Sequence, residues 1–371
     1  MSRGNGLTLP TVDRDDPTPK YLQAEQIITA AIREGRLAAG AKLPPTKVVG
    51  SMVNVSLITA HKAMERLVEA GLLRREVGRG TYVCDNVADV IASRKQSAIA
   101  LVLDQRININ DYYHGSILDG LRQAARKDDE HIEFFFQDCD SVRRMRPRRA
   151  AGAICLHPTE EYQSAIEDLQ GSMPVVLLGG TFASKSIPYV DCDNYDGARN
   201  AVRHLAELGH QRFLVLSGPT NLSNSRDRAE GARDEIRSQG HALADDDLVV
   251  CPDSLAFDDA TAQRVTERMT RANRPTAIVA GGFYLALNAL QLLRRAGLAI
   301  PRDVSIVGFD DPQSAPLLDP PLTTVRQPLE KMAHKAYEVV RRALHEGAGD
   351  VTSHEIPTEL VIRESTGSPA D

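Results

Sequence analysis

The amino-acid sequence predicts an α/β protein in which parallel sheets flanked by helices form two lobes, preceded by a winged helix-turn-helix. Two observations from residue 98 onward predict the lobes: short apolar runs alternate with helical patterns, and this alternation occurs in two successive sets. A third observation is a separate N-terminal segment with three helix patterns followed by a hairpin pattern. A chain of 371 residues is long enough for two or three domains.

Composition shifts along the chain place the boundaries. We expect a disordered tail at 1–16, the winged helix-turn-helix at 17–84, a polar linker at 85–97 and the two-lobed domain at 98–365. Within that domain, the first lobe is expected at about 98–190 and 327–352. The second lobe is expected at about 191–326 and 353–365.

The N-terminal elements follow from local signals. Apolar residues on helical spacing predict a helix over 20–35, which Gly35 ends. A second helix begins near Pro45, and Ser56 is a natural N-cap for a third, which ends at Gly71. Alternating residues then predict two strands, at 72–76 and 81–83, joined by a turn at 77–80.

Charge is divided between these parts. The whole chain carries a net charge of −6. Residues 17–84 hold ten Lys and Arg against five Asp and Glu, a balance of +5, so the remainder carries −6 − 5 = −11. A basic head on an acidic body keeps the attraction for phosphate within the head. The charge distribution therefore favours DNA binding by the winged segment.

In a winged helix-turn-helix, the second helix of the turn enters the major groove and the wing approaches the backbone or the minor groove. The candidate DNA-contacting residues are Lys47, Ser56, Thr59, His61, Lys62, Arg79 and Gly80. Thr59 and His61 can meet base edges, and the three cationic side chains can meet phosphate. The alternative is that these are only solvated polar faces. It is disfavoured because helix, turn and wing occur in the required order.

The elements after residue 97 alternate as a parallel sheet requires. Strands are expected at 97–103, 132–136, 152–156, 175–178, 212–217, 276–280 and 304–309. Helices are expected at 114–127, 194–208, 226–239 and 285–296. Ligands of open α/β sheets bind at the carboxyl ends of the strands, so a binding site is expected there.

The N-terminal segment resembles the DNA-binding domain of the GntR family of bacterial repressors. The resemblance rests on PPTK at 44–47, AMERL at 63–67, EAGL at 69–72 and GRGTYV at 78–83. The family usually has arginine at two positions that Leu57 and His61 occupy here. The resemblance therefore implies DNA binding, but the operator sequence cannot be transferred.

Residues 97–365 resemble the sensor domain of the LacI/GalR repressors, which shares its fold with periplasmic sugar-binding proteins. The matching motifs are VDCDNYDGA at 190–198, SRDRAEG at 225–231, VSIVGFDD at 304–311, PLTTVRQP at 321–328 and ELVIRES at 359–365. A GntR-type head on a LacI-type sensor is the architecture of the bacterial arabinose-repressor group. A pentose such as arabinose is the effector that this resemblance favours.

A polyhydroxylated ligand needs oriented polar side chains and an aromatic face. The candidate effector-binding residues near strand ends are Tyr112, Tyr113, Arg226, Arg228, Phe283, Asp310 and Gln327. The family counterpart of Arg228 hydrogen-bonds ligand oxygens. Three alternatives stay open: Arg226 forms a salt bridge with Asp227 or Asp310, Asp310 caps a turn, or one tyrosine belongs to the core.

Two departures from the LacI pattern bear on the site. Where the family commonly places Asn-Asp, this chain has Gly-Gly-Phe-Tyr at 281–284, which removes one polar contact and adds aromatic surface. A basic run at 143–149 replaces a more usual helix. It is interpreted as a solvated loop, with a supplementary contact to DNA or a partner as the alternative.

The sequence thus predicts a cytoplasmic, homodimeric transcription repressor whose binding to double-stranded operator DNA is controlled by a small sugar-like effector in a cleft between the lobes. An activator, or a regulator with a non-sugar effector, is the alternative. A transport protein is disfavoured because no signal peptide is present. An enzyme is disfavoured because nucleophile-elbow, P-loop and dinucleotide motifs are missing. No cofactor, metal or membrane contact is expected.

Overall fold

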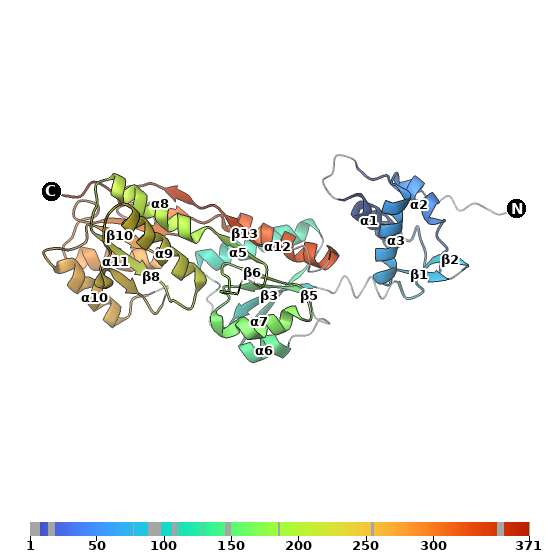
Figure 1. Ribbon diagram of the computed structural model, residues 1–371, viewed down its shortest axis with the longest axis horizontal. Helices are drawn as coiled ribbons and strands as arrows, with labels where there is room; N and C mark the ends of the chain where they lie inside the picture. The colour runs from blue at the N-terminus through green and yellow to red at the C-terminus, as the bar shows by residue number, and fades with distance from the viewer. Residues whose placement is uncertain are drawn as a thin grey trace. The chain divides into compact units, whose positions relative to one another are not determined.

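The computed structural model describes residues 8–13, 19–76, 78–87, 98–105, 109, 111–128, 130–144, 150–184, 186–253, 256–346 and 352–370. The chain divides into two compact units, Met1–Ser97 and Ala98–Asp371 (Figure 1). The larger unit is the α/β domain that the sequence predicts, with two mainly parallel sheets and helices on both faces of each. Most of the expected linker, residues 88–97, lies outside the described residues.

The smaller unit is a winged helix-turn-helix, as expected. Its elements are α1 (Lys20–Arg33), α2 (Thr46–Val53), α3 (Leu57–Glu69), β1 (Leu73–Glu76) and β2 (Gly80–Val83). The two strands pair antiparallel, with Leu73 opposite Val83. An isolated bridge between Lys42 and Tyr82 adds one further backbone pairing, which the sequence patterns do not indicate, to this two-stranded sheet.

The core of this unit explains where its elements begin and end. Ile28 from α1 and Met64 and Leu67 from α3 are buried in one apolar cluster. Ser56 caps α3 by accepting a hydrogen bond from the backbone N–H of Thr59, which satisfies one of the free donors of the first turn. At the other end, Gly71 has φ +68°, a left-handed conformation that glycine adopts without strain.

The prediction of a disordered tail at 1–16 is wrong for residues 8–13. Leu9 and Val12 are buried in the core of the winged unit. The backbone N–H of Val12 donates to the carbonyl of Val53 at 3.0 Å, which ties the segment to the end of α2. Two apolar side chains therefore order a segment whose polar composition predicts a loose tail. Residues 1–7 and 14–18 lie outside the described residues.

The first lobe of the larger unit is built on one six-stranded sheet of order β13-β7-β6-β5-β3-β4. Every pairing within it is parallel. Its strands are β3 (Ala98–Asp104), β4 (Ile132–Gln137), β5 (Ala150–Leu156), β6 (Val175–Leu178), β7 (Tyr189–Cys192) and β13 (His354–Ile356). Helices α5 (Tyr112–Lys127) and α12 (Leu329–Glu346) cover one face, and α6 (Cys139–Arg144) and α7 (Gln163–Gln170) cover the other (Figure 1).

The second lobe has the same plan, with strand order β14-β12-β11-β10-β8-β9. Its strands are β8 (Phe213–Ser217), β9 (Leu248–Val250), β10 (Ala277–Ala280), β11 (Ser305–Phe309), β12 (Thr323–Arg326) and β14 (Glu359–Val361), and only β14 runs antiparallel to its neighbour. Apolar side chains of α8 (Asn194–Glu207) and α9 (Ser223–Ser238) pack on one face. Those of α10 (Asp259–Thr270) and α11 (Phe283–Arg295) pack on the other.

The chain crosses between the lobes at three points. Two of the predicted lobe boundaries lie a few residues before the crossings in the structure. The first lobe keeps β7 through Cys192, so the crossing lies at Asp193 and not after residue 190. β13 pairs with β7, so the first lobe ends after Ile356 and not at 352. Backbone pairing decides both boundaries, and short strands of three or four residues leave little trace in the sequence. The third crossing lies between β12 and α12, beside Gln327.

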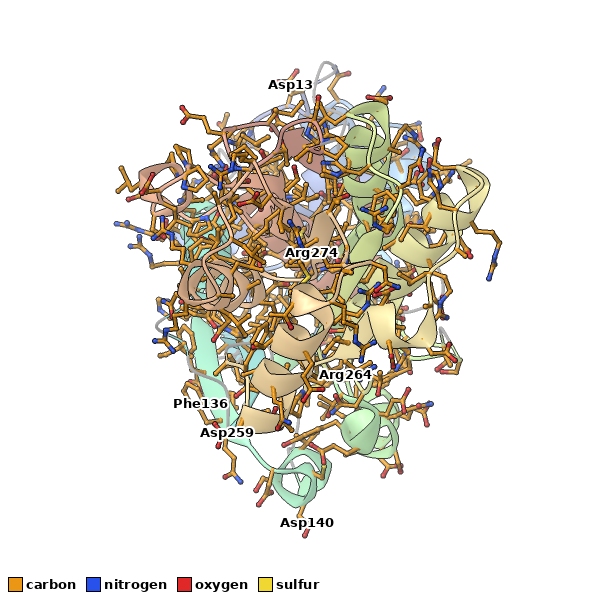
Figure 2. The ribbon with its side chains drawn as sticks, turned by 90° about the vertical axis from the view of Figure 1, so that its left-hand side faces the viewer. Asp13, Phe136, Asp140, Asp259, Arg264 and Arg274 are labelled. Carbon is orange, nitrogen blue, oxygen red and sulfur yellow. The ribbon has the colours of Figure 1, made fainter. Side chains whose placement is uncertain are left out.

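The basic run at 143–149 is also corrected. Arg143 and Arg144 form the end of the short helix α6, whose Asp140 is labelled in Figure 2, so the run begins in a helix and not in a loop. Residues 145–149 lie outside the described part of the chain. Separately, no helix among the described residues is long and apolar enough to span a membrane.

Candidate functional site

The first turn of α3 presents the residues expected to read DNA, and several of them are engaged within the protein. The Ser56 hydroxyl accepts the Thr59 N–H at 3.1 Å and lies 2.7 Å from the Thr59 hydroxyl. These two side chains therefore form the N-cap of the helix. His61 lies one turn from Glu65, with Nδ1 and Oε1 3.4 Å apart.

The cationic residues of the winged unit differ in how freely they project. Lys62 places its ammonium 3.9 Å from the centre of the Tyr21 ring, a cation–π contact that holds it against α1. Lys47 is exposed in the first turn of α2. Arg79 is 80% exposed at the wing tip. Gly80 has φ +121°, and a Cβ there would meet the side chain of Lys42, so this turn needs glycine.

In the larger unit, the carboxyl ends of strands from both lobes converge on one cluster of buried and half-buried polar side chains. His157 follows β5, Asn194 follows β7, and Gln327 follows β12. Asp310 follows β11, and Arg228 lies on α9, the helix after β8. Parallel strands of two facing sheets bring these ends together, which is where ligands of open α/β sheets bind.

Arg228 connects the parts of this cluster. Its Nε donates to Oδ1 of Asn194 at 2.8 Å, and its Nη1 donates to the carbonyl of Gly281 at 2.7 Å. The guanidinium lies 3.8 Å from the centre of the Phe309 ring. Arg228 is buried, so its charge is balanced within the cluster and held in one orientation.

Asp310 and Gln327 lie side by side in the cluster, next to the crossing between β12 and α12. Gln327 donates through Nε2 to Oδ1 of Asp310 and accepts the thiol of Cys192 at 3.0 Å. The backbone N–H of Phe283, at the start of α11, also donates to the Asp310 carboxyl. Burial raises the pKa of Asp310, and Arg228 opposes that rise. Asp310 adopts φ +72°, a strained backbone conformation that is typical of functional sites.

Phe283 itself contributes to the core more than to the cluster. Its ring is buried in the apolar cluster of the second lobe, edge-on to Tyr284. The sequence predicts that Phe283 offers an aromatic surface to the ligand. In the structure, Phe283 contributes its backbone N–H to the site instead.

Three aromatic rings from the first lobe form the opposite wall. Tyr113 stacks on His157 with ring centres 4.4 Å apart, and His114 meets both rings edge-on. Asp111 fixes His114 by accepting at 2.7 Å from its Nδ1. The tyrosine hydroxyl and the Nε2 atoms of both histidines are buried without a hydrogen-bond partner among the described residues. Buried polar atoms are nearly always hydrogen-bonded, so these three unpaired atoms mark the wall as a candidate contact surface for a ligand.

Asp191 adds a second carboxyl at the end of β7. It is buried, and burial raises its pKa to about 7, while the backbone N–H of Cys192 and the charge of Arg228 hold the rise back. Asp191, Asn194, His114 and His157 are not among the residues that the sequence predicts for this site. Asp191 and Asn194 stand within the VDCDNYDGA motif, and His157 directly follows an expected strand, so position at a strand end was the usable signal.

Two of the predicted residues, Arg226 and Tyr112, lie at the edge of the cluster. Arg226 of the second lobe forms a salt bridge with Glu160 of the first lobe at 2.8 Å. Its main partner is therefore Glu160, and not Asp227 or Asp310. Tyr112 lines a cavity of about 440 Å³ together with Arg326 and Gln327, so this cavity borders the cluster at Gln327. Of the two tyrosines, Tyr113 lies within the polar cluster and Tyr112 lies at its edge, where burial and the charge of Asp310 raise its pKa.

The lobes touch one another beside the cluster. The Ser223 hydroxyl of the second lobe accepts the Thr181 N–H of the first at 2.9 Å. Asn224 reaches the carbonyl of Gly179 at 3.4 Å. Together with the Arg226–Glu160 pair, these contacts close one edge of the junction. Among the described residues, no group of three or more His, Cys, Asp or Glu side chains is placed to hold a metal ion.

Comparison with known proteins assigns both units. Residues 20–83 match the bacterial regulatory proteins of the gntR family, and residues 202–366 match the periplasmic binding protein-like domain. An uncharacterized HTH-type transcriptional regulator from the aml 5′ region of Streptomyces limosus is 36% identical over 197 residues, covering 52% of this chain and 55% of that protein. The arabinose metabolism transcriptional repressor of Geobacillus stearothermophilus is 26% identical over 376 residues, covering 95% and 99%.

The fold has solved counterparts. A complex of the transcriptional regulator CelR with cellobiose superimposes with a TM-score of 0.65 at 22% identity, over 87% of this chain and 100% of that one. This likeness establishes the two-lobed fold of the larger unit.

Proposed function

Because the chain joins a gntR-family DNA-binding domain to a periplasmic binding protein-like sensor of the LacI type, we propose that it is a transcriptional repressor whose operator binding is controlled by a small effector. One observation carries the proposal. A buried cluster that contains hydrogen-bonding atoms without partners draws residues from both lobes, in a chain whose other unit is a winged helix-turn-helix.

The site suggests a neutral, hydroxyl-rich effector. Two carboxyl groups, Asp191 and Asp310, face one cation, Arg228, whose Nε and Nη1 donors already serve Asn194 and Gly281. Acceptors therefore predominate, and they favour a ligand that offers O–H donors. A phosphate or carboxylate on the ligand would meet the two carboxyl groups. The Tyr113–His157 stack supplies a surface for the apolar face of a sugar ring.

A pentose such as arabinose is the specific effector that we propose. The support is the full-length likeness to a repressor of arabinose metabolism. A matched comparison of arabinose with arabinose 5-phosphate tests the charge argument separately from the sugar identity, because only the phosphorylated sugar should be rejected by the carboxyl groups. Cellobiose, the ligand in the CelR structure, tests whether a disaccharide is preferred.

Control of DNA binding follows from the two lobes. A ligand held by residues of both lobes stabilises one arrangement of the lobes over another, and it changes the DNA-bound population only by its difference in affinity for the two states. A complete switch requires about 5.5 kcal/mol of such difference. We propose that the affected arrangement is that of a homodimer, since two heads must match two operator half-sites.

An edge of the first lobe supports the homodimer. β4 is the terminal strand of its sheet, and Phe134 and Phe136 on that strand are about half exposed. Phe136 lies at the outer rim of the unit in Figure 2. Apolar side chains on an uncovered edge strand are typical of an interface. We propose the cytoplasm as the site of action, because the operator is there.

The test is a titration of full-length protein with duplexes from its own promoter region, with and without sugar. We expect a specific complex that weakens when the effector is added. The Arg228→Met variant should bind the duplex but not respond to sugar, whereas Arg237→Met, an exposed residue of the same helix that pairs with Asp234, should still respond. Failure to bind any duplex specifically would exclude a DNA-binding regulator.

A further inference from the structure

Helix α3, which is expected to enter the major groove, exposes apolar side chains in its first turn. The polar side chains of the same region form contacts within the protein. Leu57 and Ile58, the first two residues of α3, are 55% and 82% exposed. Val48, in the first turn of α2, is 46% exposed. These are the exposed large apolar residues among the described part of the winged unit, and all three lie in the first turns of the adjacent helices α2 and α3 (Figure 1).

The neighbouring polar side chains form contacts with other residues of the winged unit. Ser56 and Thr59 are bonded to each other as the helix cap, Lys62 lies on the Tyr21 ring, and His61 is beside Glu65. The side chains at the start of α3 that project without such contacts are therefore the two apolar ones. A solvent-exposed Leu-Ile pair on a small domain indicates a surface that is covered in the working state.

The occupant with the right chemistry is the floor of the DNA major groove. Thymine is the base that presents an apolar group there, its C5 methyl, and apolar side chains read it by direct contact. The same unit exposes cationic groups that can hold phosphate, Lys47 on α2 and Arg79 on the wing. The unit therefore offers an apolar pair for methyl groups and separate cations for phosphates.

Resting on the proposed function, we infer that Leu57 and Ile58 select the operator by contacting thymine methyl groups, so each half-site carries a T-containing step opposite the start of α3. An arginine at the same place would favour guanine through its O6 and N7 acceptors. The pair therefore shifts base preference from G·C toward A·T at those positions.

The test uses full-length protein and a duplex selected from a random library. Each thymine of a half-site is then replaced by uracil, which lacks only the C5 methyl. Loss of one buried methyl should weaken binding about fourfold. One or two positions per half-site should show this loss, and the others should not.

Variants assign the effect to the two side chains. In Leu57→Ala or Ile58→Ala, the uracil penalty at the contacted position should disappear, while the salt dependence of binding stays the same because no phosphate contact is lost. Leu317→Ala is the control, since Leu317 lies in the sensor unit and is nearly as exposed (81%) as Ile58 (82%). It should keep the full uracil penalty.

The outcomes separate the inference from the function on which it rests. Specific binding with no uracil penalty at any position would overturn the inference alone and leave the proposed function standing. A penalty that is equal in the wild type and both alanine variants would also overturn it. Selection of no specific duplex would overturn the inference and the proposed function together.

Discussion

Replacing Asp191 by asparagine should make the sensor unit more stable at alkaline pH and leave it nearly unchanged in acid. The Asp191 carboxyl is buried beside Cys192, and burial raises its pKa from 3.8 to about 7. The rise of about three pH units corresponds to about 4 kcal/mol at 1.36 kcal/mol per unit. Asparagine keeps the shape and the oxygen that accepts the Cys192 N–H, so the main change is the loss of titration.

The direction follows from proton binding. The folded protein holds the Asp191 proton more tightly than the unfolded chain does, so this group favours folding below about pH 4. That contribution is lost as pH rises through about 7, where the buried carboxyl ionises. The free energy of unfolding of Asp191→Asn should therefore rise relative to wild type with pH, and about 3 kcal/mol of the change should fall between pH 5 and pH 8.

Urea unfolding followed by circular dichroism, at half-unit steps from pH 5 to pH 8, measures this difference. The winged unit has its own core and serves as an internal reference, because its transition should not depend on residue 191. A difference between variant and wild type that stays constant within about 0.5 kcal/mol across this range would refute the assigned burial of the charge.

Three further predictions concern the two sites. Arg228→Met should weaken effector binding at least about 100-fold by calorimetry, because it leaves the two carboxyl groups without their cation; binding within a factor of three of wild type would contradict its central role. Gly179→Ala should abolish effector binding and lower the melting temperature, since φ is +73° and a Cβ would collide with the Tyr113 hydroxyl; Gly240→Ala, at φ +80° with open space, controls for backbone strain alone. Arg79→Ala should lower the slope of log affinity against log salt by about 0.9 per wing, measured by anisotropy, and an unchanged slope would reject a phosphate contact.

The regular elements could be predicted from sequence because their signals are local. The Ser56 cap, the Gly71 stop and the apolar runs of β3, β5 and β6 depend on neighbours within a few residues. The short strands β7, β13 and β14 could not be placed, because three or four residues become a strand only through pairing partners distant in the chain.

The candidate site was predictable in part for the same reason. Arg228, Asp310, Gln327 and Tyr113 stand at strand or helix ends and do meet in the cluster. Phe283 touches it only through its backbone, and Arg226 points to Glu160, because side-chain direction depends on how the two lobes face each other. The contact between His114 and His157 could not be predicted from the sequence, because the two residues meet only when the first sheet has formed.

The central claim is that occupancy of the polar cluster controls the DNA-binding unit. It is tested most directly by fluorescence anisotropy of a labelled operator duplex titrated with full-length protein, in the presence and absence of a sugar that is shown by thermal shift to bind the same sample. We predict that the dissociation constant for the duplex rises at least about tenfold with the sugar, and that Arg228→Met abolishes the change. A sugar that binds the protein without altering its affinity for the operator would contradict the claim.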